Sequence, residues 1–441
     1  MPREDAVLNV GSRIEPFVDD WLIASLSGVA LRLHPPIPCE VALSFDAPWE
    51  GPTSAYVTVF KDGERCRMYY RGSGHEEDHR EVVCYAESPD AIHWTKPALG
   101  LFEVEGTREN NVVWMGEGAH NFAPFKDANP DAPDSQRYKA LAGGPLIALA
   151  SPDGLHWRKM RDEPVITEGA FDSQNLAFWD AERREYVAYV RGFAEGIRTI
   201  GRATSRDFLN WSGTTWLDFG DAPVEHLYTN AITPYSRAPH IHLGFPKRFL
   251  PERKVVPSWP HDGVSDGVLM TSRDGLHWRR FTEAFLRPGL DPENWTERNN
   301  MIAAGVVPTA PGELSIYWSE HYRHPTARLR RGTLRTDGFV SVHADYAGGE
   351  FVTRPLIFTG RELVINYSTS AAGSMRVELQ DAEGGPLAGR ALEDCPEIYG
   401  DEIERAVAWK GGSDLEGLQG KPIRLRFVLK DADLYAIQLR L

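Results

Sequence analysis

The stretch SPDGLHW, residues 151–157, returns three more times along the chain with nearly the same letters. The other copies are SPDAIHW at 88–94, SRDFLNW at 205–211 and SRDGLHW at 272–278, and TDGFVSV at 336–342 resembles a fifth, weaker copy. The tryptophans of the four strong copies lie 63, 54 and 67 residues apart. Self-similarity at a nearly fixed period indicates a repeat architecture.

Each period holds three runs of β-branched and aromatic residues, which Gly, Asp or other turn residues separate. In the first period these runs are SAYVTVF at 54–60, RCRMYYRG at 65–72 and EVVCYAESPD at 81–90. Such runs predict strands, and three or four antiparallel strands per period predict one small sheet per repeat. Small sheets at a fixed period are typical of a β-propeller, so we expect a propeller of five blades within residues 1–345.

The repeated motif falls at the turn after the third strand of a blade. We expect its Asp to accept hydrogen bonds from backbone N–H groups, its Gly to supply a positive φ, and its Trp to pack between blades. The last blade shows only three strands. We therefore expect the N-terminal segment, with RIEPFVDDWLIAS at 13–25 and VALRLHPP at 29–36, to supply the outer strand that closes the ring.

The repeat stops after about residue 346. The strands EFVTRPLIF, ELVINYSTS, SMRVELQD, PIRLRFVL and LYAIQLRL follow, with the period-two alternation of half-buried sheets and without the turn motif. These strands predict an antiparallel β-sandwich over residues 346–441. The chain is therefore expected to be all-β, a five-bladed β-propeller followed by a C-terminal sandwich.

Composition narrows the classes of function. The chain has 63 acidic and 48 basic residues and a formal net charge of −15, which disfavours nucleic acid as a partner. The four cysteines are far apart and suggest neither a disulfide framework nor a zinc site. No apolar run suits a signal peptide or a membrane span, so we expect a cytoplasmic protein without a membrane partner. Oligomeric state is left open, and the absence of nucleotide-binding motifs favours a protein without a cofactor.

The inner strands of a propeller converge on its axis, and each predicted inner strand here is preceded by polar residues. Such residues are costly in a merely structural ring unless they are paired, so we take them as the candidate site. The candidates are Glu50 in the first blade, His120 and Asn121 in the second, Asp172, Gln174 and Asn175 in the third, Glu225, His226, Tyr228 and Asn230 in the fourth, and Glu297, Arg298, Asn300, Glu320 and His321 in the fifth.

Four carboxylates are the candidate catalytic groups: Asp172, Glu225, Glu297 and Glu50. Hydrolysis of a glycosidic bond requires one protonated and one ionised carboxyl group, and we place Asp172 and Glu225 first. In the alternative interpretation, Glu297 pairs with Arg298 or Arg191, Glu50 is a turn residue, and the asparagines only bond adjacent blades.

The remaining candidates are expected to bind substrate. His120, His226 and His321 belong to three blades and could bind a metal or transfer protons, but hydrogen bonding to substrate is the favoured role, so no metal is expected. The guanidinium groups of Arg323, in the stretch WSEHYRH at 318–324, and of Arg191, Arg248 and Arg298 could hold an anionic sugar.

Five blades with the SxDGxxW turn, polar inner strands and an appended sandwich resemble the five-bladed propeller glycoside hydrolases, a group that includes families 32, 43, 62 and 68. The resemblance covers residues 12 to 345, and the C-terminal sandwich resembles the arrangement in family 32. It implies a carbohydrate substrate and an Asp, Asp, Glu set on the first three inner strands. The chain departs from that set, since the second blade offers His120 and Asn121 in place of an acid and the W-[ML]-N-D-P-N-G motif is absent. The resemblance therefore implies the fold, with divergent catalytic motifs.

These observations favour a glycoside hydrolase that takes the end of a glycan or a small glycoside into the central funnel. Two alternatives stay open. In a polysaccharide lyase, His120 or His226 with Tyr228 would abstract a proton next to a uronate carboxylate held by Arg298. In a non-catalytic sugar-binding propeller, the acids would only accept hydrogen bonds.

Overall fold

The computed structural model describes residues 6–74 and 80–441, and it divides the chain into two compact units. One unit spans Pro35–Leu334, and the other joins the residues up to His34 with Arg335–Leu441. This division differs from the expected boundary after residue 345. The reason is that β4 (Val29–Leu33) and β27 (Val340–Ala344) pair with each other, and β27 also pairs with the C-terminal strand.

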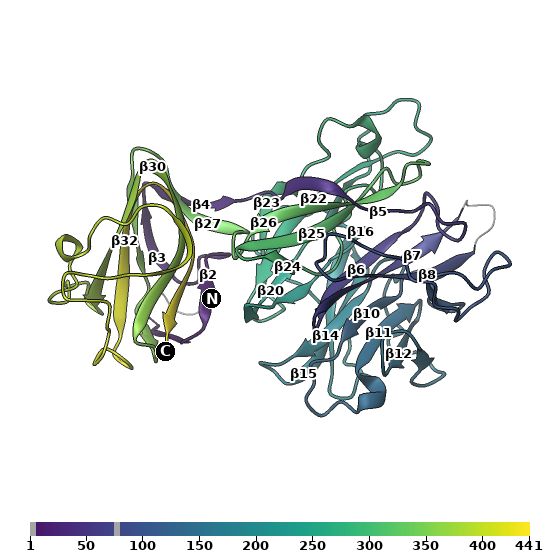
Figure 1. Ribbon diagram of the computed structural model, residues 1–441, viewed down its shortest axis with the longest axis horizontal. Helices are drawn as coiled ribbons and strands as arrows, with labels where there is room; N and C mark the ends of the chain where they lie inside the picture. The colour runs from purple at the N-terminus through teal and green to yellow at the C-terminus, as the bar shows by residue number, and fades with distance from the viewer. Residues whose placement is uncertain (1–5, 75–79) are drawn as a thin grey trace. The chain divides into compact units, whose positions relative to one another are not determined.

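The strands of the first unit form five small sheets, the blades of a β-propeller (Figure 1). Blade 1 contains β6 (Ala55–Asp62), β7 (Arg65–Ser73), β8 (Glu81–Ser88) and β9 (Val112–Met115). Blade 2 contains β10 (Ala123–Lys126), β11 (Tyr138–Gly143), β12 (Leu146–Ser151) and β13 (Arg158–Lys159), with a 3-10 turn at Asp134–Gln136. Blade 3 contains β14 (Leu176–Asp180), β15 (Glu185–Ala194), β16 (Ile197–Ser205) and β17 (Thr215–Trp216).

The last two blades are less regular. Blade 4 has six strands, β18 (His226–Leu227), β19 (Thr233–Tyr235), β20 (Ala238–Gly244), β21 (Lys247–Leu250), β22 (Val264–Ser272) and β23 (Arg279–Leu286). Blade 5 has β24 (Val307–Ala310), β25 (Glu313–Glu320), β26 (Arg328–Arg335) and β5 (Ile37–Ser44), and a 3-10 turn at Pro292–Asn294 precedes it. The short strand β21 lies outside the runs identified in the sequence.

The blades pack face to face, so both faces of their middle strands are buried. All six residues of β12, with the sequence LIALAS, are buried, and five of the eight residues of β8 in an unbroken run are buried as well. The sequence of a strand that is buried on both faces is a continuous apolar run, without alternation of apolar and polar residues. This explains why the propeller strands lack the alternation that marks the C-terminal strands.

The repeated motif forms the same turn in its four strong copies. In the copy at 151–157, Asp153 Oδ1 accepts from the backbone N–H groups of Leu155 and His156, each at 2.9 Å. Burial raises the pKa of Asp153, but the hydrogen bonds from His156 and Leu155 outweigh it and hold the pKa well below its usual range. Gly154 has φ 79°, as the motif predicts, and the equivalent Phe208 adopts φ 67° despite its side chain.

Tyrosines connect three of these four turns to the preceding blade, and the Tyr317 hydroxyl of blade 5 donates to the carbonyl oxygen of Ala91 in blade 1. The Tyr69 hydroxyl of blade 1 donates to the carbonyl oxygen of Gly154 in blade 2 at 3.0 Å, and Tyr189 of blade 3 does the same to Gly275 in blade 4 at 3.1 Å. Trp157 packs edge-on against Tyr69, with ring centroids 6.3 Å apart, so the expected packing of the motif tryptophan between blades is confirmed here.

In blade 2, a leucine takes the place of the tyrosine that makes this contact in blades 1, 3 and 5. Leu141 of blade 2 is equivalent to Tyr69 of blade 1. Tyr69 pairs with Tyr85, three residues before the turn serine of its blade, and Leu141 pairs with Ala148, which has the same place before its own turn serine. The turn that Leu141 faces carries Phe208 instead of a small residue, and the two side chains belong to one buried cluster. Apolar packing thus replaces a hydrogen bond at this blade contact.

The ring closes as expected, although with a different segment. Strand β5 pairs antiparallel with β26 as the outer strand of blade 5, so the N-terminal part of the chain does close the last blade. However, residues 13–25 and most of 29–36 contribute β2, β3 and β4 to the other unit. At the axis, Ala304 of blade 5 bridges Val57 and Val59 of blade 1 through backbone hydrogen bonds of 2.9 and 2.8 Å.

TDGFVSV at 336–342 does not form a fifth blade turn, and this expectation was wrong. Asp337 itself takes the positive φ of 61°, and the residues from Val340 onward form β27 of the second unit. This stretch departs from the motif because the chain leaves the propeller here and does not enter another blade.

The second unit is one continuous hydrogen-bonded sheet of ten strands. Besides β4 and β27, it contains β1 (Leu8–Gly11), β2 (Ile14–Pro16), β3 (Ile23–Ser27), β28 (Gly349–Thr353), β29 (Leu356–Phe358), β30 (Glu362–Asp381), β31 (Asp401–Ala406) and β32 (Ile423–Arg440), with a 3-10 turn at Leu392–Asp394. Strands β30 and β32 each unite two of the runs identified in the sequence, and they pair along their length.

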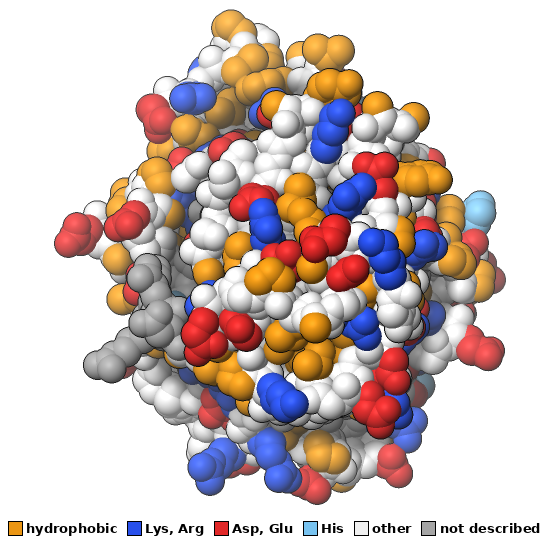
Figure 2. Space-filling view, turned by 90° about the vertical axis from the view of Figure 1, so that its left-hand side faces the viewer, with side chains coloured by type: hydrophobic (Ala, Val, Ile, Leu, Met, Phe, Trp, Pro, Cys, Tyr) orange, Lys and Arg blue, Asp and Glu red, His pale blue; other side chains and the backbone are white. Residues whose placement is uncertain are grey.

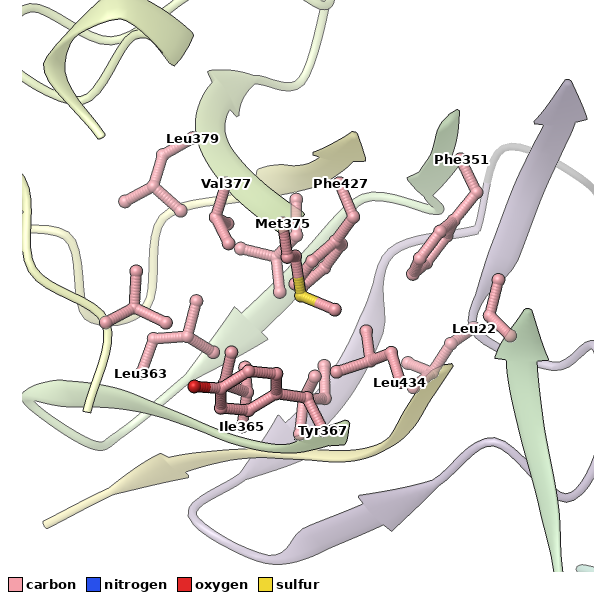
Figure 3. Packing of buried hydrophobic residues seen from close by; sticks show 14 of the residues in the cluster. Leu22, Phe351, Leu363, Ile365, Tyr367, Met375, Val377, Leu379, Phe427 and Leu434 are labelled. Carbon is pink, nitrogen blue, oxygen red and sulfur yellow. The ribbon is translucent and has the colours of Figure 1, made fainter. Parts of the chain in front are cut away.

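The core of this unit lies on one face of that sheet. Along β32, Leu425, Phe427 and Leu429 are buried and alternate with half-buried residues. Figure 3 shows Phe427 beside Phe351, with ring centroids 4.9 Å apart, and Met375 between them and Tyr367. A sheet that surrounds one apolar cluster has to fold over itself, and the two separate layers of a sandwich stay a prediction. In the described parts of the chain, no helix is long and apolar enough to span a bilayer.

Candidate active site

Each blade supplies a polar or aromatic side chain to the centre of the propeller. Tyr56, at the start of β6 in blade 1, and Tyr228, directly after β18 in blade 4, have hydroxyl oxygens 3.1 Å apart. His120 precedes β10 in blade 2, and its ring centroid lies 5.5 Å from that of Tyr56. Asp172 precedes β14 in blade 3, and Tyr322 follows β25 in blade 5. Ring closure therefore brings together positions that are remote in sequence.

His120 joins two carboxylates in a hydrogen-bonded network. Its Nδ1 lies 2.8 Å from Glu81 Oε1, and its Nε2 lies 3.0 Å from Asp172 Oδ1. Burial lowers the pKa of His120, but the hydrogen bonds to Asp172 and Glu81 outweigh it and raise the pKa above its ordinary value. Asp172 responds in the opposite sense: burial raises its pKa, and the His120 hydrogen bond with the charge of Arg191 brings the pKa below the usual value. Asp172 is thus held as a carboxylate, with 61% of its side chain exposed.

A cavity of about 330 Å³ adjoins this network, and Tyr228 belongs to its wall. Four of the lining side chains are cationic: Arg198, Lys247, Arg298 and Arg323. The other lining residues are Tyr228, Phe249, Pro260, His261, Asp262 and Glu297. Arg191 connects the two parts of the site, because its guanidinium lies 5.0 Å from the Tyr228 ring centroid and 4.0 Å from Asp172 Oδ2.

Lys247 is the most unusual of these residues. It is 1% exposed, and its Nζ has no hydrogen-bond acceptor among the described residues. The ammonium position lies 4.2 Å from the Tyr228 ring centroid. Burial and then the charge of Arg298 hold the pKa of Lys247 well below its ordinary value, because a buried ammonium next to other cations is disfavoured.

Glu297 is the carboxylate of the cavity wall. Its Oε2 accepts from the indole N–H of Trp259 at 2.6 Å, and Arg323 Nε lies 3.3 Å from its Oε1. The ion-pair partner is therefore Arg323 of the following loop, rather than the Arg298 or Arg191 considered from the sequence. These contacts fix the orientation of the carboxyl group toward the cavity.

The other predicted acids lie in structural ion pairs. Glu50 is buried in blade 1, where it accepts from Lys96 at 2.6 Å and from the Tyr70 hydroxyl. Glu225 is bound by the guanidinium groups of Arg280 and Arg248, and it is not part of the cavity wall. Glu320 is held by Arg328 and Arg330, at 2.8 and 2.9 Å. We therefore do not carry these three carboxylates into the proposed catalytic set.

The predicted amides connect blades near the axis, as the alternative interpretation had it. Asn121 forms hydrogen bonds with the backbone of Gly143 and Phe171. Asn175 does so with the backbone of Phe171, Ser173 and Arg191. Asn230 does so with the backbone of Gln174, Tyr189 and Ile232. Asn300 donates to the carbonyl oxygens of Ser265 and Asn294, and Gln174 donates to Val57 and Thr58. Buried amides with backbone partners hold the ring together, and this use leaves few of their polar atoms for a substrate.

The two remaining histidines differ in surroundings. His226 Nδ1 accepts from the backbone N–H of Arg198 at 3.1 Å, so it borders the cavity residues without lining the cavity. His321 lies in blade 5 with Asp291 and Glu293, and the three could together offer ligands to a metal ion. However, the Arg328 guanidinium lies 3.3 Å from His321 Nε2 and 3.7 Å from Asp291, which already places a cation at this cluster.

Sequence reasoning missed Glu81, Lys247 and Arg71, whose Nη1 lies 3.1 Å from His120 Nδ1. It did identify Arg323, as a possible ligand for an anionic sugar. Arg71 and Glu81 lie in runs identified as strands, RCRMYYRG and EVVCYAESPD, where the charged residue at the strand end was the available signal. Lys247 lies on β21, in the stretch FPKRFL, which carries no motif. The charges at the centre contrast with the face drawn in Figure 2, where acidic and basic side chains are interspersed.

Comparisons with known proteins give matches in structure only. No protein-family model matches the sequence, and no curated protein matches it. One solved structure, named "Glycoside hydrolase", is 13% identical, with a TM-score of 0.46 over 68% of this chain and 92% of that chain. A second structure of that name is 9% identical, with a TM-score of 0.43 over 89% and 100%. A glycosyl hydrolase from Bacteroides ovatus is 13% identical, with a TM-score of 0.42 over 74% and 99%. At this level of identity, the chemistry of the site has to be inferred from the residues of this chain itself.

Proposed function

We propose that this protein is a glycosidase that takes the end of a glycan or a small glycoside into the centre of the propeller. The supporting observation is that two carboxyl groups from different blades lie around Tyr228. Glu297 lines the same cavity as Tyr228, and Asp172 Oδ2 lies 4.0 Å from Arg191, whose guanidinium is 5.0 Å from the Tyr228 ring centroid. Glycosidic hydrolysis uses such a pair, with one carboxyl group that protonates the leaving oxygen and one carboxylate that activates water or attacks the sugar carbon.

The surroundings of the two groups suggest their roles. His120 and Arg191 stabilise Asp172 as a carboxylate, so we assign it the role of base or nucleophile. We assign Glu297 as the acid, since it lines the cavity, whereas Glu50 and Glu225 are bound in ion pairs by Lys96 and Arg280. The aromatic side chains Tyr228 and Phe249 line the same cavity and offer faces on which a sugar ring can stack.

The test is turnover on a panel of aryl glycosides and oligosaccharides, with release of reducing ends as the measurement. We expect Asp172→Asn and Glu297→Gln each to lower the rate by a factor of about 10²–10⁴, the usual contribution of a general acid or base. Glu225→Gln is the matched control, because it changes a predicted acid that the structure places in an ion pair. Unchanged turnover in both Asp172→Asn and Glu297→Gln would contradict the proposal.

A second candidate is a lyase acting on a uronate, and the position of Tyr228 favours it. Four cations surround this ring, Lys247 at 4.2 Å, Arg191 at 5.0 Å, Arg198 at 5.9 Å and Arg298 at 6.0 Å from its centroid. A hydroxyl in such a field suits proton abstraction next to a carboxylate that the cations neutralise. Formation of an unsaturated product that absorbs in the near ultraviolet would distinguish elimination from hydrolysis. Binding without turnover across the panel would instead favour a sugar-binding propeller.

A further inference from the structure

We propose that the cavity around Lys247 binds the negatively charged group of an acidic sugar, a carboxylate or a phosphate ester. The inference rests on the proposed function in one respect, namely that the ligand is a carbohydrate. It adds the charge of the substrate and the residues that recognise that charge.

The wall of the cavity holds more positive charge than its own carboxylates neutralise. Arg323 pairs with Glu297, and Asp262 is a 77% exposed side chain that pairs with Lys254. Within residues 6–74 and 80–441, no ion pair with a carboxylate is formed by Arg198, Lys247 or Arg298. Lys247 is buried, and Arg198 and Arg298 are half-buried. Cations that are removed from water without counter-charges are costly, so a cavity of this kind is completed by an anionic ligand.

Lys247 points to the place of that anion. Its Nζ is buried in the cavity wall and has no acceptor in the described chain, and it lies 4.2 Å from the ring centroid of Tyr228 and 5.9 Å from that of Phe249. Arg198 on β16 of blade 3, whose guanidinium lies 5.5 Å from the Phe249 ring centroid, also has an Nε without an acceptor. A point-like ammonium beside a guanidinium fork is a typical arrangement for a carboxylate or a phosphate.

A purely structural role explains these residues less well. Contacts between cations and aromatic rings stabilise desolvated pairs more than exposed pairs. However, a buried amine without any acceptor forgoes its hydrogen bonds, and a methionine would fill the same space without that loss. Retention of the amine at this cost is expected where a ligand supplies the missing acceptor. Tyr228 and Phe249 would then contact the apolar face of the sugar ring.

The experiment measures binding by isothermal titration to the full chain at pH 7 and low ionic strength, where charges are least screened. The probes are D-glucuronate, D-glucose 6-phosphate, D-glucose and inorganic phosphate. We expect at least one acidic sugar to bind at least about tenfold more tightly than glucose. We expect this preference to be lost in Lys247→Met and retained in Lys410→Met, which removes the same charge from an exposed lysine in the second unit.

Arg298→Gln is the second variant, in case Lys247→Met disturbs folding, and we expect it to lower the preference for the acidic sugar in the same direction. Several outcomes would overturn the inference: equal binding of glucose and the acidic sugars, equal losses for both in Lys247→Met, no binding of either acidic sugar at millimolar concentration, or inorganic phosphate binding as tightly as glucose 6-phosphate. The relative affinity of glucuronate and glucose 6-phosphate tells a carboxylate site from a phosphate site.

Failure of this inference and failure of the proposed function are distinguishable. Selective binding of an acidic sugar without turnover in any assay would count against the glycosidase and the lyase, and would leave the anion site standing. Turnover of neutral glycosides without any preference for acidic ones would count against the anion site and would support the glycosidase.

Discussion

The outer turns and the centre of the propeller both carry polar residues that recur in successive blades. They differ in whether the chain itself supplies the hydrogen-bond partners. In the outer turns, the Asp153 carboxylate accepts from Leu155 and His156, and the turn carbonyl of Gly154 accepts from Tyr69 of the neighbouring blade. At the centre, Lys247 Nζ and Arg198 Nε have no acceptor within the described residues. Polar groups that are satisfied by the chain itself serve architecture, whereas a buried amine that lines a cavity without a partner indicates a ligand.

The largest effect is expected from Gly154→Ala in the outer turns. A Cβ at this position would lie 2.6 Å from the Tyr69 hydroxyl and 2.7 Å from Arg67 Nη1, both of which are hydrogen-bonded to this turn. Together with left-handed strain, this should lower the free energy of unfolding by about 2–3 kcal/mol. Chemical denaturation measures it. Ala91→Gly in the turn of blade 1 is the control, since Ala91 already has φ 59°, and a similar loss there would contradict the explanation.

Substitution of matched aspartates sharpens the comparison. Asp153→Ala removes a carboxylate that caps two backbone N–H groups, and it should cost about 1–2 kcal/mol of stability, as the loss of a helix cap does. Asp172→Ala removes a partly exposed partner of His120, and it should change stability by less than about 0.5 kcal/mol. Urea denaturation of both variants gives the measurement. A larger stability loss for Asp172→Ala than for Asp153→Ala would show that the central carboxylate is structural.

Lys247→Met should change stability in the opposite direction to the turn variants. The substitution removes a buried amine without an acceptor and fills the space with an apolar chain of similar length. We expect the free protein to gain about 1 kcal/mol, in line with other replacements of buried charges by apolar residues. The midpoint of urea denaturation checks this. A clear loss of stability would mean that the amine has a partner in the folded chain and that the centre resembles the turns.

The smallest effect concerns pH. The folded-state pKa of His120 is raised, so its contribution to stability is fully present below the unfolded-chain value of about 6.5 and is lost as the pH rises through the folded value. The folded-state pKa of Asp153 is lowered, so its contribution is present above about 3.9 and is lost only as the pH falls through that lower value. Between roughly pH 5 and pH 8, the contribution of Asp153 should therefore stay constant, while that of His120 changes.

Thermal melting of the wild-type protein and of His120→Gln across that range is the measurement. We expect the difference between the two to shrink as the pH rises, and an NMR titration of the His120 ring to give a midpoint above the ordinary histidine value. A His120 midpoint below that value would indicate that Asp172 and Glu81 do not hold the imidazolium.

Much of the propeller was predictable because its signals are local. The turn motif specifies its own hydrogen bonds within seven residues, and strands buried on both faces leave continuous apolar runs such as LIALAS. The candidate site was predictable only as a region. Asp172, Tyr228, Glu297 and Arg298 do lie at the centre, but Glu50 and Glu225 look the same in sequence and form ion pairs elsewhere.

The sequence by itself determined the number of blades, the positions of the turns and the segments that approach the axis, because burial periodicity and turn chemistry are encoded by neighbouring residues. Only the tertiary structure decided which polar side chains are paired. Asn121 finds backbone partners in Gly143 and Phe171, whereas Lys247 finds no acceptor in the described chain. The reason is physical: a hydrogen bond depends on positions within a few ångström in space, and those positions come from residues far apart in the sequence.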